Sequence, residues 1–119
     1  MIIKAKDVPE TEMEGAGDNT KATMKRIINR EEHSENISIT WVKIRGSHEK
    51  LKCEGSDRVY YIIDGEAEFK VGDNAGKVES GDHVLIPKGV PYEFTGKMTY
   101  IVINGPAYVK GSDIYLERK

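Results

Sequence analysis

The stretch from Gly81 to Pro91 reads GDHVLIPKGVP and carries the clearest local signals in the chain. Residues 83–86 are mostly apolar and favour a short strand, and Gly81 before them favours a turn. Pro87 and Pro91 exclude a central strand at that point, because proline cannot donate to the ladder of a sheet. The stretch therefore predicts a turn, a strand of about four residues and a loop.

Strand-like segments continue on both sides of this stretch. Residues 58–63 are rich in β-branched and aromatic side chains, and residues 66–71 alternate strictly between polar and apolar. Asp64-Gly65 between them is the strongest hairpin signal in the chain. Gly96-Lys97 predicts a second tight turn, between strands at 92–95 and 98–104. Further strands are predicted at 22–29, 37–44, 77–79 and 114–116.

No window of the sequence shows helical periodicity. Many short strands within a chain of this size are typical of a β-sandwich or a small barrel. We therefore predict an all-β protein with a single barrel domain over residues 22–119, preceded by an N-terminal strand and connection over residues 1–21. Trp41 alternates with Thr40 and Val42 in a predicted strand, and we expect it in the core.

Length and composition restrict the class of protein. The 119 residues, 38% apolar and 32% charged, fit one globular domain, and no apolar run is long enough to span a membrane. A net charge of −2 argues against a dedicated nucleic-acid binder. The charged residues at 1–10 do not resemble a signal peptide, and the single Cys53 fits a reducing compartment. We expect a cytoplasmic protein with no nucleic-acid or membrane partner.

The segment from Gly46 to Phe94 resembles the cupin family. The first cupin motif is G-x5-H-x-H-x3/4-E-x6-G, and the second is G-x5-P-x-G-x2-H-x3-N. The glycines and the proline of both motifs are kept, and they stand at Gly46, Gly65, Gly81, Pro87 and Gly89. The resemblance implies a jelly-roll barrel, the cupin double-stranded β-helix. It also implies a homodimer, because cupins commonly pair through the outer sheet of the barrel.

The metal-binding positions of the cupin motifs are not kept. Lys52, Glu54, Arg58 and Tyr92 stand where the family has its histidine, histidine, glutamate and histidine ligands. Cationic side chains repel a metal ion, and only Glu54 is a good ligand. The family's metal site is therefore not carried over, and we expect no metal and no other cofactor.

The replaced residues suggest a binding pocket of another kind. If Lys52, Glu54, Arg58 and Tyr92 all point into the barrel, one positive charge remains after Glu54 neutralises one cation. Tyr60 shares the parity of Arg58 and would line the same wall. The first hypothesis is a non-metal cupin that binds a small anionic metabolite, such as a sugar acid, a carboxylate or a phosphate. The competing reading is a structural network of ion pairs at the barrel mouth.

Three other functions remain open from the sequence. The protein could be a metal-independent sugar isomerase or epimerase, with Glu54 as base and Tyr92 as acid, although such enzymes usually use a histidine base. It could be an interaction module without ligand chemistry. It could also bind a metal through non-standard ligands, if the fold gathers the three histidines. His33 and His48 are predicted to be solvated in loops, and His83 to lie on a strand.

The strand register before Glu54 leaves one alternative. Residues 54–57 look like a turn, so a slip of one residue before it would turn Leu51 and Cys53 inward in place of Lys52 and Glu54.

Overall fold

The computed structural model describes residues 1–13 and 20–116. Within these ranges the chain forms one antiparallel sheet of eight strands and a short 3-10 helix, η1 (Ala5–Asp7). The strands are β1 (Thr11–Glu12), β2 (Lys21–Ile28), β3 (Ser38–Cys53), β4 (Asp57–Val71), β5 (Asn74–Glu79), β6 (His83–Ile86), β7 (Tyr92–Gly105) and β8 (Asp113–Tyr115). No helix in these ranges is long and apolar enough to cross a membrane.

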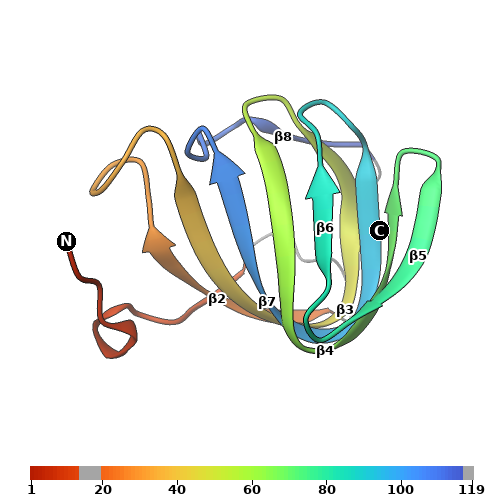
Figure 1. The fold of residues 1–119 in the computed structure, drawn as a ribbon, viewed down its shortest axis with the longest axis horizontal. Helices are drawn as coiled ribbons and strands as arrows, with labels where there is room; N and C mark the ends of the chain where they lie inside the picture. The colour runs from red at the N-terminus through yellow and green to blue at the C-terminus, as the bar shows by residue number, and fades with distance from the viewer. Residues whose placement is uncertain (14–19, 117–119) are drawn as a thin grey trace.

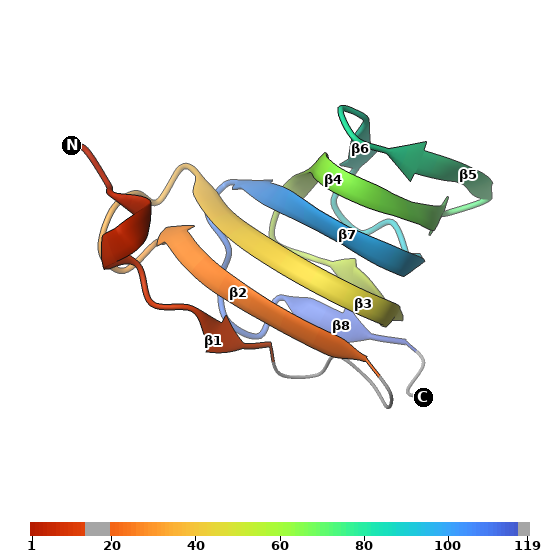
Figure 2. The same ribbon diagram turned by 90° about the horizontal axis from the view of Figure 1, so that it is seen from below.

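The sheet rolls up on itself to make the barrel (Figure 1). Its strand order is β1-β2-β3-β7-β4-β5, with β6 pairing with β4 and β8 pairing with β3. Seen from below, β2, β3, β7 and β4 lie side by side with β8 behind β3 (Figure 2). The all-β fold and its jelly-roll character are as the sequence predicts, and the division into residues 1–21 and 22–119 stays a prediction.

Two long strands bend where the sequence analysis expected breaks. Asp64-Gly65 is not a hairpin turn but lies inside β4, and Gly96-Lys97 lies inside β7. A Cβ on Gly65 or on Gly96 would collide with the backbone of the neighbouring strand, at Lys97 and Glu66 respectively. The two glycines therefore let β4 and β7 approach each other closely while both strands curve, so one strand continues where two were predicted.

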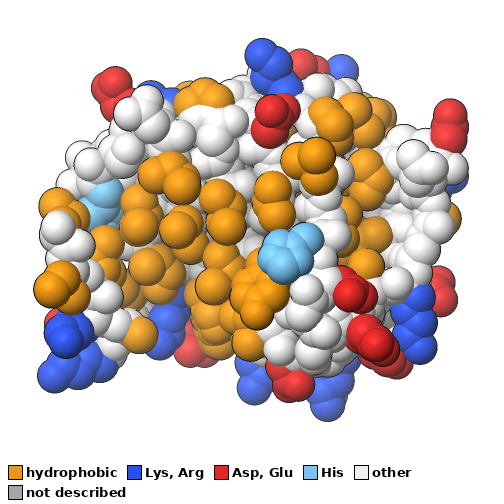
Figure 3. Space-filling view, viewed as in Figure 1, with side chains coloured by type: hydrophobic (Ala, Val, Ile, Leu, Met, Phe, Trp, Pro, Cys, Tyr) orange, Lys and Arg blue, Asp and Glu red, His pale blue; other side chains and the backbone are white. Residues whose placement is uncertain are grey.

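The core lies inside the roll. It consists of the inward side chains of β3, β4, β6 and β7, among them Val42, Ile62, Phe69, Phe94 and Tyr100. Side chains alternate along each strand, so the residues between these face outward. On the outer face many side chains are also apolar (Figure 3). The expectation for Trp41 was wrong, because Val42 beside it is fully buried and Trp41 points to the outer face.

Candidate functional site

A cavity of about 420 Å³ lies inside the barrel, against the inner faces of β2, β3, β4, β7 and β8. Its apolar wall includes Met24, Val42 and Val102, and its polar wall includes His48, Arg58, Tyr60, Tyr100, Asn104 and Asp113. A carboxylate and a cation, Glu12 and Arg26, also line the cavity. Four of the buried polar residues line this cavity: Ser38, His48, Arg58 and Asn104. In this part of the described structure, buried polar side chains therefore line a volume of the size that a small molecule fills.

Arg58 holds the polar wall together. Its side chain is almost fully buried, and each guanidinium nitrogen donates one hydrogen bond: Nε to Asn104 Oδ1 at 3.0 Å, Nη1 to the Tyr92 hydroxyl at 2.8 Å and Nη2 to Asp113 Oδ1 at 3.0 Å. Burial works against the charge of Arg58, but Tyr92, Tyr60 and Asp113 outweigh it and raise its pKa. Arg58 is therefore a fixed cation, and the carboxylate of Asp113 balances its charge.

Two tyrosines extend the hydrogen bonding from Arg58 into the barrel. The hydroxyls of Tyr60 and Tyr92 lie 2.8 Å apart, and either can donate to the other. Burial raises the pKa of both phenols, and Arg58 opposes this rise. Both hydroxyls therefore stay protonated at neutral pH, and they form a hydrogen-bonded chain that ends at the Arg58 guanidinium.

Tyr100 adds a third hydroxyl without a partner. Its ring packs on Tyr60 with a centroid distance of 4.9 Å, and burial raises its pKa. Its hydroxyl is buried and finds no hydrogen-bond partner among the described residues. An unsatisfied buried hydroxyl costs about 1–3 kcal/mol, so it suits a group that binds something entering the cavity.

His48 stands on the same wall as a neutral imidazole. It is 5% exposed, and its Nδ1 lies 2.8 Å from the backbone oxygen of Glu49. A carbonyl oxygen only accepts, so Nδ1 carries the proton and Nε2 is left as an acceptor. Burial lowers the pKa of His48, although the Glu49 carbonyl works in the other direction. The imidazole is therefore a base at neutral pH and not a cation.

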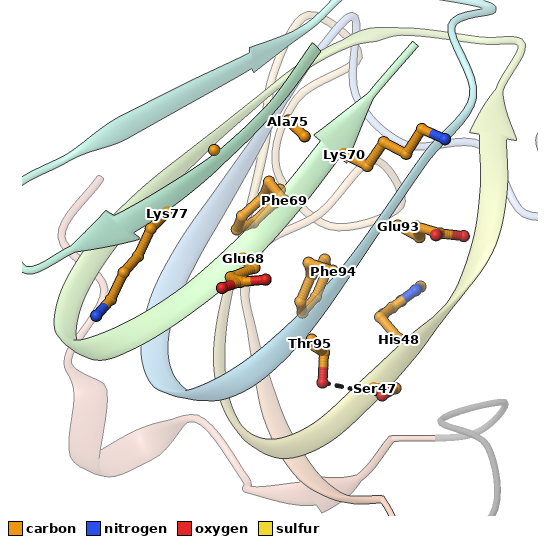
Figure 4. A pocket seen from close by; sticks show the side chains of 11 residues that line it. Ser47, His48, Glu68, Phe69, Lys70, Ala75, Lys77, Glu93, Phe94 and Thr95 are labelled. Atoms are coloured by element: carbon orange, nitrogen blue, oxygen red, sulfur yellow. Dashed lines mark hydrogen bonds between the residues drawn. The ribbon is translucent and has the colours of Figure 1, made fainter. Parts of the chain in front are cut away.

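His48 also borders a second cavity. Its ring lies tilted against Phe94 at a centroid distance of 4.9 Å. Both residues line a hollow of about 430 Å³ between β3, β7, β4 and β5 (Figure 4). Outward side chains such as Glu68, Lys70 and Glu93 line that hollow. The prediction that His48 is solvated in a loop was wrong, because β3 continues past Gly46 to Cys53.

A bulge in β3 decides which residues face the barrel. The pairing of β3 with β7 shifts register between His48 and Leu51, which reverses the parity of the residues that follow. Leu51 and Cys53 are buried, as in the alternative register. Lys52 pairs across the ladder with Ile114, which is 40% exposed, so both lie on the outer face.

The structure thus separates the five residues predicted to form the ligand site. Arg58, Tyr60 and Tyr92 lie together in the barrel, whereas Lys52 and Glu54 form an ion pair of 2.8 Å outside it, with side chains 33% and 48% exposed. Glu54 is therefore not brought near Tyr92 as a catalytic base. Sequence reasoning missed four members of the site. They are His48, Tyr100, Asn104 and Asp113.

The residues of this wall do not fit a cupin metal ion. A guanidinium stands at its centre and repels a cation. His33 accepts a hydrogen bond from the Asn29 amide in a loop, and His83 stacks on Tyr61 on the outer face, so neither joins His48. Within residues 1–13 and 20–116 no three metal-ligating side chains gather.

Comparison with known proteins places the chain in a family. Residues 27–105 match the model described as "Mannose-6-phosphate isomerase, cupin domain", which covers well over half of the chain. No curated protein matches the sequence. Three solved structures share the fold at low identity, and the coverage of both chains is high for each.

The first is the nucleoside dehydratase Pac13 of Streptomyces, with a TM-score of 0.82, 13% identity, and 99% of this chain and 92% of Pac13 covered. KdgF from Halomonas sp. has a TM-score of 0.75 and 14% identity, covering 91% and 94% of the two chains. The polyketide cyclase RemF from Streptomyces resistomycificus has a TM-score of 0.76 and 17% identity, covering 98% and 87%. The family match, supported by these folds, shows that the chain belongs to the cupins.

Proposed function

We propose that the protein is a metal-independent acid–base catalyst that acts on a small hydroxylated metabolite, a sugar or a nucleoside, inside the barrel. The observation that carries the proposal is the neutral His48, with Nε2 free of a proton, on the same cavity wall as Tyr60 and Arg58. A base and a proton donor that line one cavity are the minimum for such chemistry.

The groups divide the work between them. Nε2 of His48 accepts a proton from a C–H next to a carbonyl or from a hydroxyl of the substrate. Tyr60 donates its proton to the oxygen that leaves or becomes an enol, and Tyr92 stabilises the phenolate that forms by a hydrogen bond. The cycle closes when His48 returns the proton it has taken up, to the substrate carbon or to solvent, and Tyr60 takes one back from the product hydroxyl or from solvent. Arg58 stabilises the negative charge that develops on that oxygen. Loss of water, isomerisation and epimerisation all use this set of transfers.

The known relatives support a hydroxylated substrate. The family model is named for an isomerase of a sugar phosphate, and Pac13 is a nucleoside dehydratase. Solved Pac13 structures include one histidine-to-glutamine variant and two tyrosine-to-phenylalanine variants, each with uridine. The present chain likewise brings one histidine and two hydrogen-bonded tyrosines together in its barrel, at His48, Tyr60 and Tyr92.

The charge of the site favours a neutral ligand over the anionic metabolite expected from the sequence. Lys52 and Glu54 face outward, and Asp113 balances Arg58. Glu12 and Arg26 also line the cavity with opposite charges, so a carboxylate or phosphate would meet no net positive charge there. Arg58 still has one hydrogen on each terminal nitrogen that no described residue accepts, and these suit hydroxyl or carbonyl oxygens. The single Cys53 is buried and free, which suits the cytoplasm as the place of action.

The test is turnover and proton exchange in deuterated water, followed by NMR, with uridine and a panel of sugars and sugar phosphates. We expect His48→Gln to lower the rate of the active compound about 10²–10⁴-fold. His83→Gln is the matched control, because His83 lies on the outer face, and it should leave the rate unchanged. Exchange that is equal in the His48 and His83 variants would overturn the proposal.

Tyr100 provides an independent test of ligand binding. Tyr100→Phe removes a buried hydroxyl that has no hydrogen-bond partner among the described residues, so we expect weaker ligand binding with a thermal stability that is unchanged or slightly raised. Tyr60→Phe is the contrasting variant, because it also removes the hydrogen bond to Tyr92 and should lower stability. Equal ligand affinity in wild type and Tyr100→Phe would remove Tyr100 from the binding site.

A further inference from the structure

The outer face of the sheet carries a row of three cations that the proposed function does not use. Lys21 on β2, Arg45 on β3 and Lys97 on β7 are cross-strand partners in register, and these three strands are neighbours in the sheet (Figure 2). All three side chains are exposed, whereas Ile44 and Met98 beside them are buried in the core. Because side chains alternate between the two faces of a strand, the row points away from the barrel.

A hollow of about 340 Å³ lies against this row. Its other wall is the next outward row of the sheet, which consists of Thr23, Lys43, Thr99 and Asp64. Every residue that lines the hollow belongs to these two rows or to the row between them, so the hollow lies on the outer surface and not in the barrel. We call it the outer basic groove, and its four cations are Lys21, Lys43, Arg45 and Lys97.

These four cations have no ion-pair partner among residues 1–13 and 20–116. Asp64 is the one carboxylate that lines the groove, so four positive charges there face one negative charge. Glu66 follows Lys97 in the row, but its carboxylate lies 3.3 Å from Lys77 on β5. Like charges directly opposite each other destabilise a sheet, and an anion bound in the groove would remove that cost.

We infer that the outer basic groove binds a small ligand with two or three linked phosphate groups, either a free oligophosphate or the phosphate chain of a nucleotide. Arg45 stands in the middle of the row, and its guanidinium can bind a phosphate through two parallel hydrogen bonds. Lys21 and Lys97 stand one strand to either side, so the row spans about 10 Å. Lys43 adds a fourth charge from the opposite wall.

The continuation of the row limits the length of the ligand. Beyond Lys97 the same row continues with two carboxylates, Glu66 on β4 and Glu79 on β5. A nucleic-acid strand that followed the row would meet these carboxylates, and the net charge of −2 also disfavours such a partner. A single phosphate, in turn, would leave most of the four cations unpaired. The charge pattern therefore favours a short chain of phosphates.

The first experiment measures the binding of inorganic triphosphate by calorimetry at low salt, with orthophosphate, ATP and a single-stranded oligonucleotide as comparisons. We expect one triphosphate per chain, bound at least about tenfold more tightly than orthophosphate, with an affinity that falls as salt is added. Tighter binding of ATP than of triphosphate would identify a nucleotide as the source, and equal or weaker binding would show that the phosphate chain alone is recognised. No saturable binding of triphosphate, or an oligonucleotide bound more tightly than triphosphate, would overturn the inference.

The second experiment locates the site by removing single charges. Arg45→Gln and Lys97→Gln should each weaken triphosphate binding about tenfold, since each removes a charged hydrogen-bond donor. Lys110→Gln is the matched control, because it removes the same charge from an exposed position outside the groove, and it should bind triphosphate as the wild type does. Equal affinities in these three variants would overturn the inference.

Two further measurements separate binding in the groove from effects on folding and from binding in the barrel. Without ligand, Arg45→Gln should melt at the same temperature as the wild type or higher, because it relieves repulsion between like charges. Triphosphate should raise the melting temperature of the wild type more than that of Arg45→Gln, since it binds only the folded chain. In NMR titrations, the amide shifts should centre on residues 43–45 and 97–99. Shifts that centre on Arg58 would place the anion in the barrel and contradict the inference.

Discussion

Arg58–Asp113 and Lys52–Glu54 are two ion pairs of nearly equal length in opposite surroundings. Their shortest N–O distances are 3.0 and 2.8 Å. The side chains of Arg58 and Asp113 are 6% and 18% exposed, whereas those of Lys52 and Glu54 are 33% and 48% exposed. The slightly shorter pair is therefore the one that water screens, and distance alone does not rank them.

The two pairs differ in what the fold loses when one partner is removed. In the inner pair, Arg58 also donates hydrogen bonds to Asn104 and Tyr92. Removing Arg58 therefore leaves several buried groups without a hydrogen-bond donor. The outer pair touches solvent, which replaces either partner easily. Arg58 and Asp113 line the barrel cavity, whereas Lys52 and Glu54 lie outside the barrel.

The largest expected effect comes from breaking the inner pair. Arg58→Met leaves the hydroxyl of Tyr92 and the oxygens of Asn104 and Asp113 without their donor, and it should cost about 3–5 kcal/mol of unfolding free energy. Urea unfolding at neutral pH measures this. A loss below about 1 kcal/mol would mean that the inner pair is no more than a surface contact.

The next effect tests the register that separates the two pairs. Leu51 is 1% exposed, so Leu51→Ala should cost about 2–4 kcal/mol in the same assay. Cys53→Ser provides a smaller change on the same inward side. If Leu51→Ala proves as mild as a surface substitution, β3 lacks the bulge after His48 and Lys52 faces the barrel.

A pH dependence should follow from the buried histidine. Because burial lowers the pKa of His48, the unfolded chain binds its proton at a higher pH than the folded one. The contribution of His48 to the unfolding free energy is fully present above about pH 6.5. It is lost as the pH falls through the pKa of His48 in the folded protein. Unfolding free energies at neutral and mildly acidic pH should therefore differ less in His48→Gln than in wild type. An identical acid dependence in the two proteins would show that His48 titrates normally.

The smallest effect belongs to the outer pair. Lys52→Met should change the unfolding free energy by about 0.5 kcal/mol or less, since Glu54 remains solvated. We also expect Lys52→Met to leave the catalytic rate unchanged, because neither Lys52 nor Glu54 lines the barrel cavity. A large loss of either stability or turnover in Lys52→Met would return Lys52 to the site.

Local sequence was enough to predict much of the fold. The strand at 83–86 and the loop after it are present as predicted, because glycine and proline act through their own backbone. Gly65 and Gly96 were predicted as turns and are bends, because the close approach of a neighbouring strand, which local sequence does not contain, decides between the two. The cupin motifs predicted the overall architecture correctly, because their glycines mark positions where the backbone must adopt a particular conformation.

The site could be predicted only in part. Arg58 and Tyr60 lie on one uninterrupted stretch of β4, so alternation placed them correctly in the barrel. His48 could be found only by knowing that β3 carries a bulge, and a bulge depends on pairing with β7. Asp113 comes from the far end of the chain and reaches Arg58 through the short pairing of β8 with β3. No local pattern marks it.

The most direct test of the account is the protonation state of His48, measured by heteronuclear NMR of its imidazole nitrogens at neutral pH. The account predicts a neutral ring with the proton on Nδ1, bonded to the Glu49 carbonyl, and with Nε2 as the acceptor. His83, on the outer face, serves as the internal reference for a solvated ring. An imidazolium at His48, or a neutral ring with its proton on Nε2, would contradict the assignment of His48 as the base.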